Sequence, residues 1–580
     1  MKRTLALLLT LALVISCVFA VQAFTPPESY VHHYARTSET LSPVIEGETY
    51  HFPVKQGDFF FYFNRMQEDA AYRDAHFDWL RMFRVLKTNG YYTMPRYSAK
   101  ETKKSDGRTF FYISLNGFYD YEAYSAQFGT PPEGVIYGVT VGDYGNYILQ
   151  TDVSGEYLPA SYPDGVWRYE ALESHPEWFI NPQTPVGGLY SGDCGGYYGG
   201  PAYFFNFDEE ELEAFTDYMA SVILKYARKT GYTGLFFDYC SAGLDGSFVP
   251  GRILDLFQSK YGLSSRAQAV EKYNELAGAF LSLLRSKLPE EFEIFANQSL
   301  YAHEDYYENV DYDLVESYFT SYTYGRLPRT IQVKGKDGNV SAISTSQTFF
   351  RPWTSDKADS DYDWVKNGSG ISDFLSVPAP ALAAIKADPE NSPSFYFLDY
   401  MIPKYVVCGE DEAGNPIYEA QTDRNAIYYS YAGSKLLGCS GSNSDWYGGE
   451  GEYDQDDLYF VDLGAPVGDD YALKKWDGTA ATGDEQADYV IRYYENGFVL
   501  LTTGKITEPT KITVPKDGTS GKRGIYDLYE TNFIKNASGD HAITLQPELY
   551  EMYAGYVNPA DENDIDDGYR PLGRVFLYVD

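Results

Sequence analysis

Short apolar runs alternate with amphipathic helical stretches between about residues 59 and 448, and this alternation constrains the fold more than any other feature of the sequence. The runs at 59–63, 110–114 and 134–137 are continuously apolar, which is typical of strands buried on both faces. The stretch 209–226 instead carries apolar residues at three- and four-residue spacing, as one face of a helix does. Because strands that alternate with helices form parallel sheets, the pattern predicts parallel βα units.

Later units repeat the same order of strand and helix. Strand-like runs lie at 233–237, 292–296, 312–315 and 394–398, and further helices are expected at 265–288 and 424–437. We therefore predict the α/β class, with a (β/α)8 TIM barrel over residues 24–455. A Gly- and Tyr-rich stretch at 187–200 is too long for a plain connector, so we expect a loop insertion that takes part in binding.

The pattern changes after about residue 456. The apolar runs 489–494 and 498–501 flank Glu495-Asn496-Gly497, and Asn-Gly between two such runs is the strongest short-range signal for a β-hairpin. Short strand-like runs continue at 511–514, 541–545 and 574–578. We expect residues 456–580 to form a small antiparallel β-sandwich domain.

The first 23 residues have the composition of an export signal. Met1-Lys2-Arg3 is basic, an apolar run follows, and small residues precede a cut after Ala23. An alternative is Val14-Ile15-Ser16-Cys17, which resembles a bacterial lipoprotein box in which Cys17 carries the lipid. No later run reaches the ~18 apolar residues that a membrane helix needs. We expect a secreted or cell-surface protein.

The charge balance argues against two classes of partner. The chain has 46 Lys and Arg against 83 Asp and Glu, which gives a formal charge of −37. Nucleic acids and anionic membranes gain affinity from basic residues, and this chain would repel them. Export would leave four cysteines, which we interpret as buried or opportunistically paired thiols: Cys194, Cys240, Cys408 and Cys439.

Metal-binding patterns are weak in this sequence. It contains no Cys-x-x-Cys and no His-x-x-x-His spacing, so a zinc site has no support. The acidic run 561–568 has oxygen ligands at calcium-like spacing but lacks the Glu that closes an EF-hand loop, and we interpret it as a solvated loop. We predict neither a metal nor a cofactor.

Polar residues stand where four successive strand-like runs end, at Asp238, Asn297, Glu316 and Asp399. In a parallel barrel the carboxyl ends of all strands open on one face, where active sites are assembled. Two carboxylates beside an apolar wall can differ in proton affinity, and glycoside hydrolysis requires such an acid and its partner. The pattern favours a glycoside hydrolase that acts on a poly- or oligosaccharide.

Each carboxylate also has a simpler interpretation. Asp238 could cap the following helix, since Asp is a preferred N-cap residue. Asp399 precedes a turn-like Met401-Ile402-Pro403, whereas Glu316 is a poor cap between apolar neighbours. Two other functions therefore remain as alternatives. One is a non-catalytic carbohydrate-binding or cell-wall surface protein on a degenerate barrel, and the other is a metal-dependent hydrolase that uses the acidic residues.

Several segments resemble TIM-barrel glycosidases of the endo-α-1,4-polygalactosaminidase type and related bacterial families. The similar segments are 174–178, 201–206, 232–238, 461–468 and Arg492 with 495–497. The resemblance implies a catalytic Asp after the fourth strand and a catalytic Glu after the sixth. By position, Asp238 would be the nucleophile or base and Glu316 the general acid. The chain departs from that pattern in the 187–200 insertion and in Cys240.

Aromatic residues gather around the expected site. The chain has 57 Tyr, and a rigid ring with a hydroxyl tip suits a ligand that offers both apolar faces and hydroxyls. Tyr residues recur beside the strand ends, including Tyr400, and in the 187–200 insertion. As substrate-binding residues we predict Asn297, Tyr239, Tyr318, Asp399 and Trp446.

Overall fold

Eight parallel strands form the central sheet, in the order β18-β15-β10-β9-β8-β5-β4-β3. The computed structural model describes residues 41–62 (except 56), 83–88, 108–119, 171–184, 202–230, 233–238, 251–297, 304–322, 329–351 (except 336, 337, 346 and 347), 370–445 (except 389 and 391), 457–516 (except 469 and 484–486) and 522–580 (except 536–538, 559 and 560). The strands are β3 (Gly57–Tyr62), β4 (Phe83–Thr88), β5 (Arg108–Ser114), β8 (Gly234–Asp238), β9 (Glu293–Asn297), β10 (Tyr312–Glu316), β15 (Ser394–Met401) and β18 (Ser440–Asp445).

This strand order confirms the predicted α/β barrel class. Neighbours in the sheet follow the chain order, and β18 also contacts β3, the first strand. The described residues fall into two compact units by packing. One unit contains β5, β8 and nearly all of β9, and the other contains β3, β4, β10, β15, β18 and the C-terminal sheets. The predicted domain boundary at 455/456 stays a prediction.

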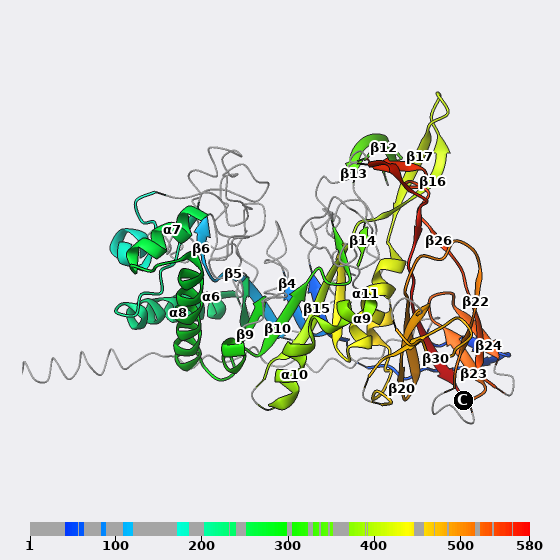
Figure 1. The fold of residues 1–580 in the computed structure, drawn as a ribbon, viewed down its shortest axis with the longest axis horizontal. Coiled ribbons are helices and arrows are strands. Elements are labelled where there is room, and N and C mark those ends of the chain that lie inside the picture. The colour runs from blue at the N-terminus through cyan, green and yellow to red at the C-terminus, as the bar shows by residue number, and fades with distance from the viewer. Residues whose placement is uncertain are drawn as a thin grey trace, which may run out of the picture. The chain divides into compact units, whose positions relative to one another are not determined.

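Among its described residues, the first unit contains the helices α6 (Leu212–Thr230), α7 (Gly251–Lys260) and α8 (Arg266–Lys287). Both α6 and α7 contact α8 (Figure 1). The helix α8 begins at Ser265, whose side chain accepts the Gln268 N–H as an N-cap does. Its buried face is made by Tyr273, Leu276 and Phe280 among others, which confirms the amphipathic spacing expected for this segment.

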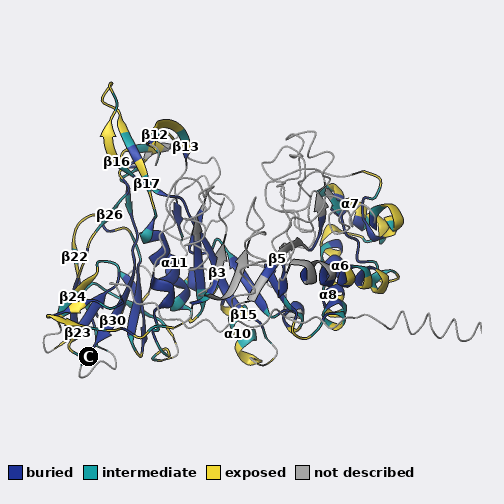
Figure 2. Cartoon of the chain, turned by 180° about the vertical axis from the view of Figure 1, so that it is seen from behind, coloured by how far each residue is buried: buried dark blue, intermediate teal, exposed yellow. Residues whose placement is uncertain are grey.

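A pair of hairpins extends from the second unit as a four-stranded sheet in the order β13-β12-β17-β16. Its strands are β12 (Arg329–Lys334), β13 (Val340–Thr345), β16 (Lys404–Glu410) and β17 (Pro416–Gln421). Two short helices, α9 (Ile371–Ser376) and α10 (Ala379–Ala387), precede β15. Figure 2 shows exposed residues at the β16–β17 hairpin, in contrast to strands such as β15, which is buried apart from its first residue. The sequence analysis did not predict this sheet.

The C-terminal part is antiparallel, as predicted. A six-stranded sheet has the order β19-β20-β21-β30-β23-β24, and β22 pairs with β25. The bounds are β19 (Ala472–Lys474), β20 (Tyr489–Tyr494), β21 (Gly497–Thr502), β22 (Thr510–Val514), β23 (Gly524–Asp527), β24 (Asn532–Lys535), β25 (His541–Leu545) and β30 (Gly573–Val579). One apolar cluster joins both sheets, including Ile491, Phe498, Ile512 and Ile543, so the two sheets pack face to face.

Five shorter pairings complete the strands of the described residues. They are β1 (Val44–Ile45) with β2 (Glu48–Thr49), β6 (Gly117–Tyr119) with β7 (Ala202–Phe204), β11 (Thr320–Tyr322) with β14 (Thr348–Phe350), β26 (Glu548–Leu549) with β29 (Tyr569–Arg570), and β27 (Tyr556–Asn558) with β28 (Asp561–Asp566). None of the helices in the described ranges combines the length and apolarity needed to cross a bilayer.

Helix α11 (Arg424–Leu436) joins the barrel strands to the C-terminal sheet within the second unit. It contacts β15 and β18 on the barrel and β20, β21 and β30 on the C-terminal sheet. Eleven of its residues are buried, as expected of a helix with packed elements on more than one face. A Cβ at Gly573 of β30 would lie 2.3 Å from the Tyr429 Cα, so only glycine permits this close approach.

The segment between barrel and β-domain is bound to the β20–β21 hairpin. The Asn496 side chain donates to the Asp462 carbonyl over 2.9 Å, and Glu495 accepts the Ala465 N–H over 3.0 Å. The Arg492 guanidinium donates to the Leu436 carbonyl at the end of α11 over 2.8 Å. These residues carry part of the family resemblance. In the structure they connect the β20–β21 hairpin to the segment 462–465 and to the end of α11.

His541 makes the stability of the β-domain depend on pH. Its ring is 2% exposed between Phe498 and Tyr578, and neither ring nitrogen has a hydrogen-bond partner among the described residues. Burial lowers the pKa of His541 to about 4. Between about pH 6.5 and 4 the unfolded chain therefore binds a proton that the folded chain does not, and stability falls as the pH falls.

We expect His541→Phe to remove this loss, which is on the order of 2 kcal/mol after allowance for solvent screening. The loss is measured by urea unfolding of wild type and His541→Phe at pH 7 and pH 4.5. His51 is exposed, and His51→Gln serves as the control. An identical pH dependence in wild type and His541→Phe would contradict the expectation.

Candidate functional site

Glu316 is the last residue of β10 and lies half-buried at the carboxyl end of the sixth barrel strand. The Asn297 side-chain amide, at the end of β9, donates to Glu316 Oε2 over 2.6 Å. The Tyr400 hydroxyl, on β15, donates to Glu316 Oε1 over 2.9 Å. Three neighbouring strands thus place one carboxylate between two neutral hydrogen-bond donors.

The two donors give the oxygens of Glu316 different properties. An amide N–H can only donate, so Oε2 beside Asn297 serves as an acceptor. A phenol can donate or accept, so the Tyr400 hydroxyl can turn and accept from Oε1 when the carboxyl is protonated. The arrangement is therefore compatible with both protonation states of Glu316.

The backbone after Glu316 bends sharply. Ser317 has φ 57°, a left-handed conformation that residues with a side chain seldom adopt. Its N–H donates to the Leu398 carbonyl over 2.6 Å, and its carbonyl accepts from Arg351 Nη1 over 2.6 Å. Glu316 itself stays in register with Leu398.

Asp399 does not lie at the end of a strand, because β15 continues to Met401 and pairs with β18 over this whole stretch. Its carboxylate is 1% exposed, and Oδ1 accepts the Phe319 N–H over 2.7 Å and the Thr320 N–H over 3.0 Å. Burial raises the pKa of Asp399 to about 7. The structure thus places this carboxylate against backbone, whereas the sequence analysis expected it to contact substrate.

Tyr318 lies in the core. Its ring is 2% exposed and stacks on Phe374 with centroids 4.4 Å apart, and its hydroxyl donates to the Phe374 carbonyl. Burial raises the pKa of Tyr318 well above its usual range. Of the predicted substrate-binding residues, the structure brings Asn297 to Glu316 and keeps Tyr318 and Asp399 apart from it.

Asp238 is the last residue of β8, as expected for the end of the fourth strand. Its side chain lies outside the described part of the chain, as do Tyr239, Trp446, Cys194, Cys240 and the 187–200 insertion. The pairing of Asp238 with Glu316 therefore stays a prediction. Tyr400, which the sequence analysis noted without giving it a role, is the partner that was missed. Tyr400 lies on the same strand face as Leu398, which pairs with Glu316, and this register is known only from the structure.

The two family-like segments before α6 are hydrogen-bonded to each other. The Asn206 N–H donates to the Trp178 carbonyl and the Ile180 N–H to the Phe204 carbonyl, each over 2.9 Å. His175 donates or accepts a hydrogen bond with Glu177 over 2.9 Å and stacks on Trp178. These hydrogen bonds hold the segment that precedes α6 against residues 178–180.

No cluster of three potential metal ligands occurs in the residues that the structure describes. In the acidic run 561–568, Asp566 binds the Arg570 guanidinium at 3.0 and 2.9 Å and accepts the Gly568 N–H over 2.7 Å. The Asp567 carboxylate lies 2.6 Å from Lys505 Nζ. Both carboxylates are thus engaged by cations of the chain itself. Cys408 and Cys439 are free thiols.

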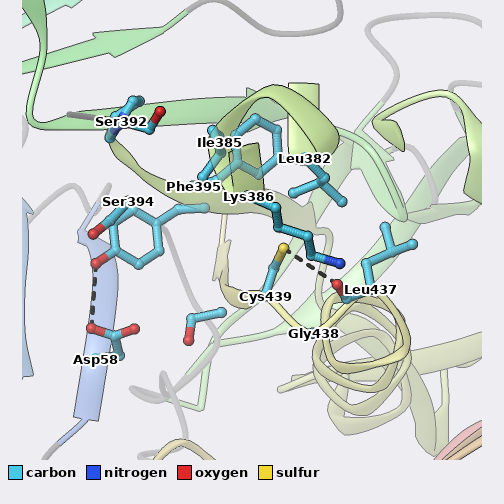
Figure 3. A pocket seen from close by; sticks show the side chains of 13 residues that line it. Asp58, Leu382, Ile385, Lys386, Ser392, Ser394, Phe395, Leu437, Gly438 and Cys439 are labelled. Atoms are coloured by element: carbon cyan, nitrogen blue, oxygen red, sulfur yellow. Dashed lines mark hydrogen bonds between the residues drawn. The ribbon is translucent and has the colours of Figure 1, made fainter. Parts of the chain in front are cut away.

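A cavity of about 370 Å³ lies at the amino ends of β3, β15 and β18 (Figure 3). Its polar lining includes Asp58, which accepts from the Tyr396 hydroxyl over 3.3 Å, together with Lys386, Ser394 and Ser440. Barrel active sites form at the carboxyl ends of the strands. The cavity is therefore at the opposite edge of the sheet from Glu316 and does not belong to its site.

Comparisons with known proteins find structural matches of low identity. No protein-family model and no curated protein matches it. Among solved structures, a family 27 β-L-arabinopyranosidase from Geobacillus stearothermophilus is 7% identical, with a TM-score of 0.42 over 91% of this chain and 96% of that one. An Anoxybacillus α-amylase is 10% identical, with a TM-score of 0.36 over 90% and 98%.

An isomalto-dextranase from Arthrobacter globiformis is 11% identical, with a TM-score of 0.37 over 91% of this chain and 72% of that one. The chain is thus structurally similar to TIM-barrel glycoside hydrolases at low identity. A similarity of this degree concerns the fold and identifies no particular family.

Proposed function

We propose that this chain is an exported glycoside hydrolase that cleaves a poly- or oligosaccharide with Asp238 and Glu316. The observation that supports it most is the setting of Glu316. This carboxylate stands at the carboxyl end of the sixth strand of a parallel barrel, held by Asn297 on one oxygen and Tyr400 on the other. Barrel enzymes assemble their catalytic residues at such strand ends.

In the proposed reaction Glu316 is the general acid. Its Oε1 gives a proton to the glycosidic oxygen while the bond from that oxygen to the anomeric carbon breaks. Asp238 either attacks the anomeric carbon, or takes a proton from a water that attacks it. In the first case water then hydrolyses the glycosyl ester and returns a proton to Glu316, so each carboxyl ends in its starting state.

Digestion of a panel of neutral and amino-sugar polysaccharides, followed as new reducing ends, tests the proposal. We expect wild type to hydrolyse at least one member and Asp238→Asn to be slower by roughly 10²–10⁴-fold, because the nucleophile or base is lost. Asp255→Asn changes an exposed carboxylate on α7 and is the matched control, with wild-type rates expected. Binding without hydrolysis by wild type would instead favour a non-catalytic carbohydrate-binding protein. Full activity of Asp238→Asn would refute the assignment of Asp238 and Glu316 as the catalytic pair.

A further inference from the structure

Three consecutive residues of β15 hold the segment that follows Glu316. The Leu398 carbonyl accepts the Ser317 N–H over 2.6 Å. Asp399 Oδ1 accepts the N–H groups of Phe319 and Thr320, and the Tyr400 hydroxyl donates to Glu316 itself. Leu398 and Asp399 thus bind the bend formed by residues 317–320, and Tyr400 of the same tripeptide binds Glu316, the residue before it.

The bend needs such support. Ser317 at φ 57° is in a region that is unfavourable for any residue with a Cβ, and such conformations persist only where the surroundings impose them. Two N–H groups, of Phe319 and Thr320, are directed into the protein and require an acceptor there. Asp399 is that acceptor.

A buried carboxylate is a costly way to satisfy two N–H groups. Asp399 is 1% exposed, and its Oδ2 has no hydrogen-bond partner among the described residues. Arg351 lies near enough to favour its charge, but the guanidinium donates to the Ser317 carbonyl. Arg351 and Asp399 therefore bind the same bend, Arg351 at a carbonyl and Asp399 at two N–H groups. An apolar side chain would avoid the desolvation cost but would leave the bend without its acceptor.

We propose that Asp399 is a positioning residue that acts on Glu316 through the bend 317–320 and does not contact substrate. This inference rests on the proposed function, because it gives Asp399 a catalytic effect only through Glu316. If it is correct, the two hydrogen bonds that Asp399 accepts from the backbone matter and its charge matters less. An amide oxygen in the same place would then preserve the site.

Two variants separate positioning from substrate binding. Asp399→Asn keeps an acceptor oxygen, whereas Asp399→Leu removes it. We expect Asp399→Leu to lower kcat on an aryl glycoside by roughly 10²-fold with little change in KM, as a displaced catalytic group does. Asp399→Asn should restore kcat to within about threefold of wild type. If Asn lowers kcat/KM as much as Leu does, or if Leu leaves kcat unchanged, the inference is overturned.

Hydrogen exchange followed by mass spectrometry gives a readout that needs no substrate. The peptide containing Phe319 and Thr320 should exchange faster in Asp399→Leu and as slowly as wild type in Asp399→Asn. If wild type hydrolyses no glycoside, the proposed function fails, and with it the catalytic effect of Asp399. The exchange rates then still decide whether Asp399 holds the bend.

The bend can also be tested without changing the buried carboxylate, should Asp399→Leu fail to fold. Ser317→Gly suits the left-handed conformation, whereas a β-branched Ser317→Val opposes it. We expect Val to lower kcat and to speed exchange of the same peptide, and Gly to do neither. Equal kcat in the two variants would show that the bend does not position Glu316.

Discussion

Glu316→Gln is expected to lower kcat/KM on a natural glycosidic bond by roughly 10²–10⁴-fold, because an amide cannot supply the proton that the leaving oxygen needs. The loss should be much smaller on a 2,4-dinitrophenyl glycoside, whose leaving group departs as a stable anion. Glutamine keeps the shape of the side chain, and its single amide oxygen can still accept from the Asn297 amide. The difference between the two substrates therefore measures the contribution of proton donation by Glu316.

The measurement is a series of aryl glycosides with leaving groups of decreasing acidity, assayed with wild type and Glu316→Gln. Glu308→Gln, an exposed residue of the 3₁₀ turn Glu304–Asn309, is the matched control and should follow wild type throughout. An equal loss on every leaving group would show that Glu316 is the nucleophile or base, and Asp238 would then be the acid. No loss at all would remove Glu316 from the mechanism.

The sequence predicted the strands of the barrel better than the directions of their polar residues. The runs that end at Asp238, Asn297 and Glu316 are strands that end at those residues in the structure. Continuous apolar runs made this possible, since a strand buried on both faces leaves little ambiguity. The carboxylate at Glu316 and the amide at Asn297 therefore meet as the barrel prediction required.

Asp399 shows why the remainder was not predictable. The apolar run 394–398 suggested a strand that stops before Asp399, but pairing with β18 extends it to Met401. Side chains alternate along a strand, so Tyr400 lies on the same face as Leu398, which pairs with Glu316, and Asp399 lies on the opposite face. Tyr400 reaches Glu316, and Asp399 meets the backbone instead. Only the register between β15 and its neighbours contains that information.

The largest effect on stability is expected from Arg574→Met. Arg574, on β30, is 1% exposed, and its Nη1 donates to Asn425 of α11 over 3.1 Å. Its guanidinium lies 3.7 Å from the centre of the Tyr529 ring, and Nη2 lies 3.6 Å from Glu548. One side chain thus connects the C-terminal sheet to the helix that packs on the barrel strands.

Removing this cation takes one partner from Asn425 and one from Glu548, both of which are shielded from water. Burial works to raise the pKa of Glu548, but Lys404 and Arg574 together outweigh it and hold the pKa below its usual value. Methionine fills a similar volume but provides neither the charge nor the hydrogen bonds. Breaking one partner of a buried ion pair costs roughly 3–5 kcal/mol, and we expect a loss in this range at pH 7.

Urea unfolding of wild type, Arg574→Met and Arg523→Met measures the loss. Arg523 directly precedes β23 of the same C-terminal sheet. Its side chain is 39% exposed, and its ion pair with Glu46 spans 3.7 Å. Exposed pairs contribute about 0–1 kcal/mol, so the control should unfold close to wild type. The double variant Arg574→Met with Glu548→Gln should be more stable than the sum of the two single losses predicts, because each group is costly chiefly when the other is absent. Strict additivity, or a loss below about 1 kcal/mol in Arg574→Met, would mean that packing of α11 against β30 at Gly573 suffices without the ion pair.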